Sequence, residues 1–217
     1  KVISTTSAIM KLYDNKLLDL DDPVISHLPE FKGRQKKYFD HKSSITIKDL
    51  LTHTSGLPPF RQYFLMKGSV DARLDSIYNT EPVFDLHETM VYSDVGIIIL
   101  GKIVETISKV KLDVFVQSNI FDPLGMNNTF YNPPKEKLHR IVPTEIDPKG
   151  KLIKGYVHDE NAYSIGGVAG HAGLFSKTKD LAIFSQMMLN KGLYGWKRIF
   201  RSETVDLFTQ RSNIIQG

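Results

Sequence analysis

The sequence predicts an α+β protein in which helices predominate. Residues 94–107 carry the most apolar helical pattern of the chain, and apolar residues also recur at helical spacing in residues 1–15 and 178–189. Residues 127–165 are rich in Asn, Pro and Gly, and leave room for only two or three short strands. The 217 residues, 41% of them hydrophobic and 24% charged, suffice for one large domain or two small ones.

The first third of the chain alternates helical patterns with breaks. Residues 1–15 form an amphipathic pattern, and Pro23 and Pro29 bracket a short helical or irregular piece that ends near Phe31. The polar, basic segment 33–44 is predicted to be a mobile loop. Thr46 is the predicted N-cap of the next helix, because Asp49 stands three residues later in a capping-box arrangement.

That helix is predicted to stop at residues 54–56, where Gly56 can take the left-handed conformation. We expect His53 to tie the helix end to the Thr54-Ser55 turn. Residues 70–79 then form another short helix. Ser93 or Asp94 should cap the helix through residue 107, which we expect to be central and buried because apolar residues lie on several of its faces.

The second half of the chain begins with a helical pattern over residues 112–120. Residues 151–157 are the best candidate strand, and the glycine-rich loop 166–173 allows a close approach of its backbone to a ligand or another segment. Ser176 or Thr178 is predicted to cap the next helix, which Gly192 closes. Ser202 is predicted to cap a last helix over residues 203–210.

Composition excludes several classes of site. The chain has no cysteine, so disulfides, thiolate metal sites and cysteine nucleophiles are absent. Its net charge is +4, but the basic residues are scattered apart from the cluster in 32–37, so no nucleic-acid-binding stripe is expected. No apolar run approaches the ~20 residues of a membrane-spanning helix. Both ends, Lys1 and residues 214–217, are interpreted as cut.

Tyr92 and Asp94 stand two residues apart where a loop turns into the central helix. We interpret this pair, Lys1 and the loop 166–176 as parts of one cleft. The simpler alternatives are that Lys1 is a solvated chain end and that Tyr92 packs its ring with its hydroxyl in water. His158, Asp159 and His171 suggest metal ligands, but a His–Asp hydrogen bond that holds the glycine-rich loop is favoured, because no Glu or Cys at ligand spacing accompanies them.

The chain resembles the serine β-lactamases and penicillin-binding proteins, in particular the class C β-lactamase and DD-peptidase-like branch. Lys1 and residues 2–24 resemble the segment that follows the Ser-x-x-Lys motif, and residues 45–57 are similar to one of the branch's most specific stretches. Tyr92-Ser93-Asp94 resembles the Tyr-x-Asn motif, and residues 170–182 resemble the segment on the rim of the cleft. The similarity runs through the whole chain in a consistent order.

The resemblance implies the β-lactamase/transpeptidase-like fold, a helical domain beside an antiparallel sheet flanked by helices. Residues 1–217 would be a partial domain, mostly the helical part, without the segment that carries the nucleophilic serine and without the C-terminal strands. The implied function is a serine acyl-hydrolase that acts through an acyl-enzyme on a β-lactam, a D-alanyl peptide or a small ester, in the periplasm or cell envelope. No metal and no cofactor are expected.

The resemblance also assigns roles. Lys1 and Tyr92 would form the catalytic base network, because a serine hydroxyl is a poor nucleophile until a neighbour takes its proton, and a partly buried lysine is easier to deprotonate. Asp94, His171 and Gly173 would bind substrate. Asp94 replaces the usual asparagine and, when ionised, cannot donate to a substrate carbonyl, so it is a candidate partner for Lys1.

Two further departures limit the implied function. The motif serine would stand three positions before Lys1, and the third motif, His-Thr-Gly or Lys-Thr-Gly, would follow Gly217, although residues 171–173 imitate it. The chain as printed is therefore expected to be inactive. The alternative is a non-catalytic relative that binds cell-wall fragments or a partner protein. Helix faces without their sheet would be uncovered, which predicts a possible dimer.

Overall fold

A computed structural model describes residues 1–212; the predicted chain end at 214–217 lies outside the described residues. A π-helical turn over Val2–Thr6 runs directly into α1, and the other helices of the first half are α2, α3, α4, α5 and α6. Their bounds are α1 Ser7–Asp14, α2 Val24–His27, α3 Phe39–Ser44, α4 Ile47–Leu51, α5 Val70–Tyr78 and α6 Asp94–Ser108.

The second half holds shorter helices and the strands. The helices are α7 Leu112–Val116, α8 Asp122–Leu124, α9 Glu160–Ser164, α10 Thr178–Leu189 and α11 Ser202–Thr209. The strands are β1 Phe130–Tyr131, β2 Glu145–Ile146, β3 Leu152–Ile153, β4 Leu174–Phe175, β5 Leu193–Tyr194 and β6 Lys197–Arg198. They form three antiparallel pairs, β1 with β4, β2 with β3, and β5 with β6. The α+β prediction with few short strands is confirmed.

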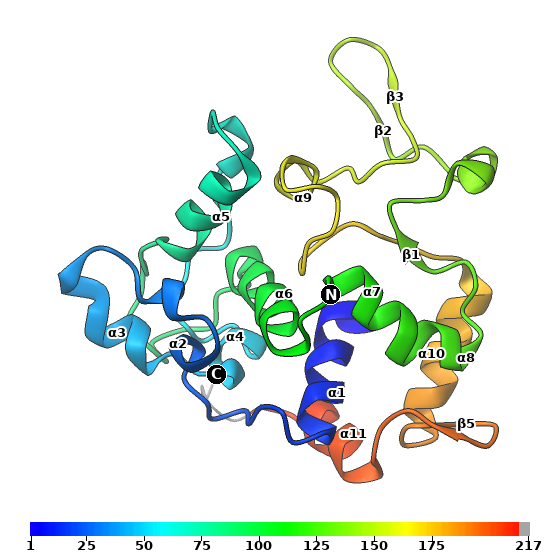
Figure 1. Ribbon diagram of the computed structural model, residues 1–217, viewed down its shortest axis with the longest axis horizontal. Coiled ribbons are helices and arrows are strands. Elements are labelled where there is room, and N and C mark those ends of the chain that lie inside the picture. Colours follow the sequence, from blue (N-terminus) through cyan, green and yellow to red (C-terminus); the bar gives the residue numbers. More distant parts are fainter. Residues whose placement is uncertain (213–217) are drawn as a thin grey trace.

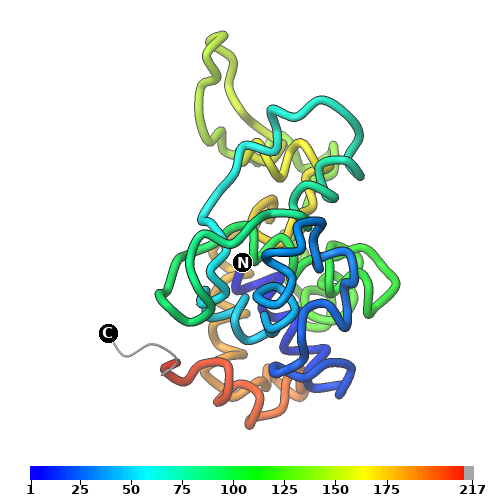
Figure 2. The backbone as a smooth tube through the Cα atoms, turned by 90° about the vertical axis from the view of Figure 1, so that its left-hand side faces the viewer, coloured from blue at the N-terminus to red at the C-terminus, as the bar shows by residue number. Residues whose placement is uncertain are grey.

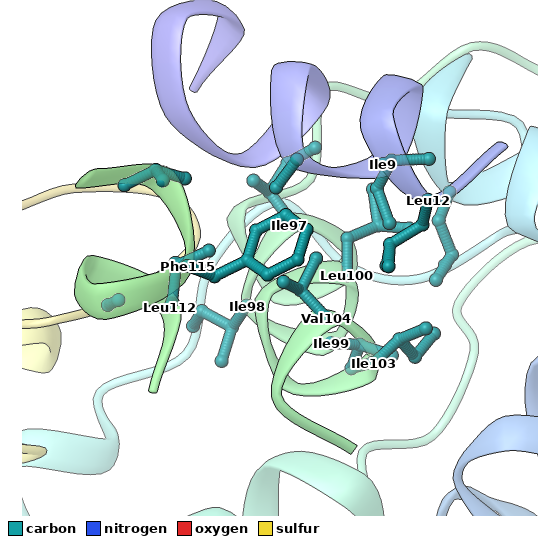
Figure 3. Packing of buried hydrophobic residues seen from close by; sticks show 14 of the residues in the cluster. Ile9, Leu12, Ile97, Ile98, Ile99, Leu100, Ile103, Val104, Leu112 and Phe115 are labelled. Atoms are coloured by element: carbon teal, nitrogen blue, oxygen red, sulfur yellow. The ribbon is translucent and has the colours of Figure 1, made fainter. Parts of the chain in front are cut away.

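The helix α6 lies at the centre of the molecule, as its apolar pattern predicts (Figure 1). It packs against α1, α2, α4, α5 and α7. Its Ile97 and Leu100 lie beneath α1, close to Ile9 and Leu12, in the apolar core that Figure 3 shows. Burial of such a helix on several faces supplies most of its stability and fixes the position of its first turn.

Two segments project from this helical body. The β2–β3 hairpin extends away from the core in both views, and α5 lies on the same side of the molecule (Figures 1 and 2). The start of the chain lies between them and the core, beside α6 and α7 (Figure 1). The residues around Lys1 therefore sit at the base of these projections.

Two of the predicted helix caps are confirmed. Thr46 and Asp49 form the predicted capping box at the start of α4. Ser93 caps α6, where its hydroxyl oxygen accepts a hydrogen bond from the Gly96 N–H at 3.2 Å.

The predicted N-caps of α10 and α11 were wrong, although both helices are present. Lys177 precedes α10 without a side-chain cap, while the Ser176 hydroxyl is bonded to Thr129 at 2.8 Å. Ser202 is the first residue of α11 rather than its cap, because the chain enters the helix with the Arg201 N–H bonded to Asp14. At α10 the distant Thr129 takes the hydroxyl that local capping would have used, and at α11 the distant Asp14 holds the residue that precedes the helix.

The prediction of a mobile loop at residues 33–44 was also wrong, because this segment contains a 3₁₀ turn and α3. Lys42 explains the difference. Its side chain is buried, with 1% of the residue exposed, and its ammonium donates to the backbone oxygens of Tyr78 and Thr80 and lies 4.4 Å from the Phe31 ring centroid. These contacts hold residues 33–44 against the core, although their polar and basic composition predicted a solvent-exposed loop.

Candidate active site

Lys1 and Tyr92 are in contact at the base of the two projections. The Nζ atom of Lys1 lies 5.1 Å from the centroid of the Tyr92 ring and 3.0 Å from a carboxylate oxygen of Asp94. The expected pairing of Lys1 with Asp94 is therefore confirmed. Tyr92 is 57% exposed, so much of its side chain is open to solvent beside the positive charge of Lys1.

The pKa of the Lys1 side chain differs from the expectation that partial burial makes this lysine easier to deprotonate. Burial lowers the pKa of the Lys1 amine, but the Tyr92 hydroxyl and the Asp94 carboxylate outweigh that effect and raise the pKa above its ordinary value. Lys1 is therefore an ammonium at neutral pH.

The central helix places Tyr92 and Asp94. Ser93, between them, caps α6 and donates its hydroxyl hydrogen to the Pro58 carbonyl at 2.7 Å, while the Asp94 N–H bonds the Pro59 carbonyl at 2.9 Å. Side chains at this loop-to-helix junction are held from both sides. The predicted junction thus brings Tyr92 and Asp94 to Lys1.

His171 and Asp159 form the predicted His–Asp hydrogen bond, with 2.8 Å between His171 Nε2 and Asp159 Oδ1. The side chain of His171 is 1% exposed, so the ring lies behind the surface of the cleft. Asp159 also caps α9 by accepting from the Ala162 N–H. Burial raises the pKa of Asp159, but the bonds from His171 and Ala162 and the charge of Lys1 lower it below its ordinary value.

The glycine-rich loop is anchored to the start of the chain by buried polar side chains. The Thr5 hydroxyl donates to the Gly170 carbonyl at 2.6 Å, and the Ser4 and Tyr131 hydroxyls are 2.8 Å apart. The Tyr131 hydroxyl also contacts the Ala169 carbonyl. At Gly170 the backbones are so close that an added Cβ would lie 2.0 Å from the Ile97 carbonyl oxygen of α6. Together these contacts join the glycine-rich loop to α6 and to Ser4 and Thr5 at the start of the chain.

Asp94, Asp159 and His171 converge, each with a potential metal-ligand atom within 4.8 Å of the others. Two carboxylates and an imidazole are suitable donors for a divalent cation. However, the Lys1 ammonium already provides positive charge 3.0 Å from Asp94, and His171 and Asp159 are bonded to each other. We interpret the cluster as a polar site held together by the Lys1–Asp94 ion pair and the His171–Asp159 bond, and the expectation of no metal stays a prediction.

A hollow of about 520 Å³ adjoins this cluster. It is lined by residues from 140–144, 156–159 and 172–176, and Asp159 and Gly173 belong to its wall. Gly173 has a φ of +109°, and an added Cβ would lie 2.3 Å from the Gly167 carbonyl oxygen, so a side chain there would distort the loop. The predicted role of Gly173 in substrate binding stays a prediction, with its backbone at the edge of the hollow.

The sequence interpretation missed residues that support the site. His53 contacts Tyr92, with ring centroids 4.6 Å apart, instead of tying the Thr54-Ser55 turn. Gly56 is left-handed, as predicted, but it lies beyond the end of α4. The left-handed residue that follows the C-cap of α4 is His53. Ser4, Thr5 and Tyr131 carry no local signal, because their partners are distant in the chain. The spacing from Asp159 to Ala162 was a readable N-cap signal.

Comparisons with known proteins agree with this architecture. A family model described as Beta-lactamase matches residues 1–211. A Salmonella agona (strain SL483) protein named "Putative D-alanyl-D-alanine carboxypeptidase" is 36% identical over 234 residues, which cover 98% of this chain and 54% of that protein. The chain thus spans about half the length of the curated relatives it matches.

Two solved structures show the same fold. The crystal structure of FmtA from Staphylococcus aureus superposes with a TM-score of 0.73 and 18% identity, over 94% of this chain and 53% of that one. A class C beta lactamase from Rhodobacter sphaeroides gives a TM-score of 0.70 and 20% identity, over 94% and 52% of the two chains. The β-lactamase/transpeptidase-like fold is therefore confirmed. Within residues 1–212, no helix has both the length and the apolar character needed to cross a membrane.

Proposed function

The chain belongs to the beta-lactamase family, and we propose that it is part of a serine acyl-hydrolase whose base network is Lys1 and Tyr92. The observation that carries the proposal is the contact between these two residues, with the Lys1 ammonium 5.1 Å from the Tyr92 ring centroid. A nucleophilic serine needs a neighbouring group that accepts its proton, and this pair lies where the central helix begins.

In the proposed reaction the serine of the Ser-x-x-Lys motif, three residues before Lys1, attacks an acyl carbon. The serine proton passes to the Lys1–Tyr92 network, the serine–acyl bond forms, and the leaving group departs with a proton from the same network. Water then attacks the acyl-enzyme, gives up a proton to the network, and the serine oxygen leaves with it. Because Lys1 is held as an ammonium, it stabilises charge and cannot accept the serine proton. We assign proton acceptance to Tyr92, which must react as the phenolate and becomes the phenol as the serine–acyl bond forms.

Asp94 and the His171–Asp159 pair support this network in different ways. Asp94 balances the Lys1 charge, and the buried His171 ring holds the glycine-rich loop, so we propose that His171 shapes the substrate site without touching substrate. The Gly173 backbone and the adjoining hollow would contact the substrate. The substrate class is a β-lactam, a D-alanyl peptide or a small ester, and the name of the Salmonella relatives favours the peptide.

Testing the full-length protein against nitrocefin, a D-alanyl-D-alanine peptide and a p-nitrophenyl ester examines this proposal. We expect hydrolysis of at least one of them, and a loss of about 100-fold in kcat for Tyr92→Phe. Tyr163→Phe is the matched control, because Tyr163 is similarly exposed but packs against Tyr156 instead of Lys1. Full activity of Tyr92→Phe would exclude the proposed network.

We propose that residues 1–217 alone are inactive, which a covalent penicillin probe tests.

A second candidate function is a non-catalytic binding protein for cell-wall fragments or a partner protein. The specific observation in its favour is Asp94, because an ionised carboxylate bonded to Lys1 cannot donate to a substrate carbonyl as asparagine would. Binding of a peptidoglycan fragment without turnover of any of the three substrates would support it. Action in the cell envelope and dimerisation through exposed apolar surface stay predictions.

A further inference from the structure

His53 contacts the Tyr92 segment at three points. Its backbone carbonyl accepts the N–H of Val91 at 2.9 Å, and its Nδ1 atom accepts the N–H of Ser93 at 3.1 Å. Its ring lies against the Tyr92 ring, with centroids 4.6 Å apart and planes inclined by 39°. One residue therefore holds the backbone on both sides of Tyr92 and the ring between them.

The backbone of His53 adopts a rare conformation to make these contacts. His53 follows the end of α4 with a φ of +61°, in the left-handed region that residues with a side chain seldom occupy. The next N–H, of Thr54, still bonds back to the Asp49 carbonyl of α4 at 2.9 Å. The strained residue thus lies between a fixed helix end and the Tyr92 segment, and its contacts on both sides maintain the conformation.

The hydrogen bond from Ser93 requires a neutral imidazole, because a protonated Nδ1 atom cannot accept. Burial lowers the pKa of His53, the Lys1 charge lowers it further, and Asp94 opposes them, so the pKa lies below its ordinary value. With Nδ1 accepting, the remaining ring proton resides on Nε2. The His53 ring therefore stays uncharged at neutral pH, next to the Lys1 ammonium.

We propose that His53 is the positioning residue of Tyr92, which sets the direction of the Tyr92 ring and hydroxyl relative to Lys1. Only the expected effect on kcat rests on the proposed function; the effect on the position of the Tyr92 ring does not. Tyr92 is 57% exposed, so burial does not fix its ring, and the His53 ring is its aromatic neighbour within residues 1–212. Two backbone hydrogen bonds and one ring contact then replace the packing that would orient a buried tyrosine.

The test compares His53→Asn and His53→Gly in the full-length protein. Asparagine tolerates the left-handed conformation and offers an oxygen near the position of Nδ1, but it lacks the ring. Glycine also tolerates the conformation, but it lacks both the acceptor and the ring. His87→Asn is the matched control, because His87 is also left-handed, with a φ of +64°, but its ring is bonded to Asp49.

The first readout is the NMR signal of the Tyr92 ring, assigned with Tyr92→Phe. We expect His53→Asn and His53→Gly to abolish the ring-current shift from the imidazole and to make the ring mobile, while His87→Asn changes nothing. The second readout is kinetic. We expect kcat to fall about tenfold in His53→Asn and about 100-fold in His53→Gly, with KM nearly unchanged.

The two readouts separate the two proposals. Unchanged Tyr92 signals in a folded His53→Asn protein would overturn the positioning role, whatever the activity. Altered Tyr92 signals in His53→Asn, together with a wild-type protein that hydrolyses none of the three substrates, would support the positioning role and contradict the proposed hydrolase. If His53→Gly does not fold, His53→Asn decides alone, because it keeps the backbone conformation and the acceptor.

Discussion

The carboxylate of Asp94 lies 3.0 Å from the ammonium of Lys1, and this ion pair helps to hold the positive charge of Lys1 in the candidate site. Burial by itself would favour the neutral amine, but Asp94 and the Tyr92 hydroxyl together raise the pKa of Lys1 above its ordinary value. A substitution of one side chain by another of similar shape can therefore change the protonation of the lysine without changing the architecture.

Asp94→Asn should lower the pKa of the Lys1 amine, because it removes a negative charge and leaves the cost of burial in place. The measurement is a pH titration of the Lys1 side-chain NMR signal in the full-length protein. Glu105→Gln is the control, since Glu105 pairs with Lys102, away from Lys1. An unchanged titration of Lys1 in Asp94→Asn would show that the ion pair does not determine its charge.

Asp159→Asn should destabilise the protein at pH 7 by about 1–3 kcal/mol, because the buried His171 ring loses its charged acceptor. The pKa of Asp159 is lowered by folding, so its contribution is present above the ordinary value of 3.8 and is lost as the pH falls through the folded-state pKa. The difference in free energy of unfolding between wild type and variant, measured with urea, should therefore shrink in acid.

The control for this prediction is Glu145→Gln. Glu145 and His158 form a similar pair, but both side chains are about half exposed, so the change should cost less than about 1 kcal/mol. Equal destabilisation by the two substitutions would contradict the importance of the buried pair.

Gly170→Ala should be strongly destabilising, by about 3 kcal/mol, because its Cβ would lie 2.0 Å from the Ile97 carbonyl oxygen and neither backbone can move freely. Gly96→Ala, within α6, meets only ordinary contacts, the nearest being 3.4 Å from a Leu50 side-chain carbon. Its stability should stay within about 1 kcal/mol of wild type. Thermal unfolding measures both, and a Gly170→Ala protein as stable as Gly96→Ala would refute the close packing of the loop on α6.

Lys42→Met should change how stability depends on pH at alkaline values. Burial lowers the pKa of Lys42 to about 8, whereas the unfolded chain keeps the ordinary value of 10.5. The unfolded state therefore binds more protons between these values, and the wild type gains stability as the pH rises from about 8 to 10.5. The variant should lack this gain, which we expect to be of the order of 1–3 kcal/mol.

Urea unfolding of both proteins at pH 7.5 and pH 10 measures that gain. Below pH 8 the free energy of unfolding of Lys42→Met also includes the loss of the hydrogen bonds to the Tyr78 and Thr80 carbonyls, which lack a donor in this variant. Lys48→Met, at an exposed position of α4, is the control. Parallel pH profiles for wild type and Lys42→Met would contradict the lowered pKa.

Local sequence patterns predicted the parts of the fold that depend on neighbouring residues. Thr46 and Asp49 form a capping box, Ser93 caps α6, and the apolar pattern of residues 94–107 identifies the central helix, because each feature depends on residues within one or two turns. The segment 33–44 and the start of α10 were predicted wrongly. There, Lys42 and Ser176 form bonds with distant partners that no local pattern contains.

The candidate site divides in the same way. Residue types and motifs alone predicted Lys1, Tyr92 and Asp94 as groups of one candidate site, a hydrogen bond between a histidine and an aspartate at the glycine-rich loop, and the family that the motifs resemble. The folded structure was needed to show that Lys1 is held as an ammonium, that the His171 side chain is buried, and that the His53 ring lies against Tyr92. The reason is physical: residue type determines which groups are present, whereas charge and orientation depend on burial and on neighbours that folding brings from distant parts of the chain.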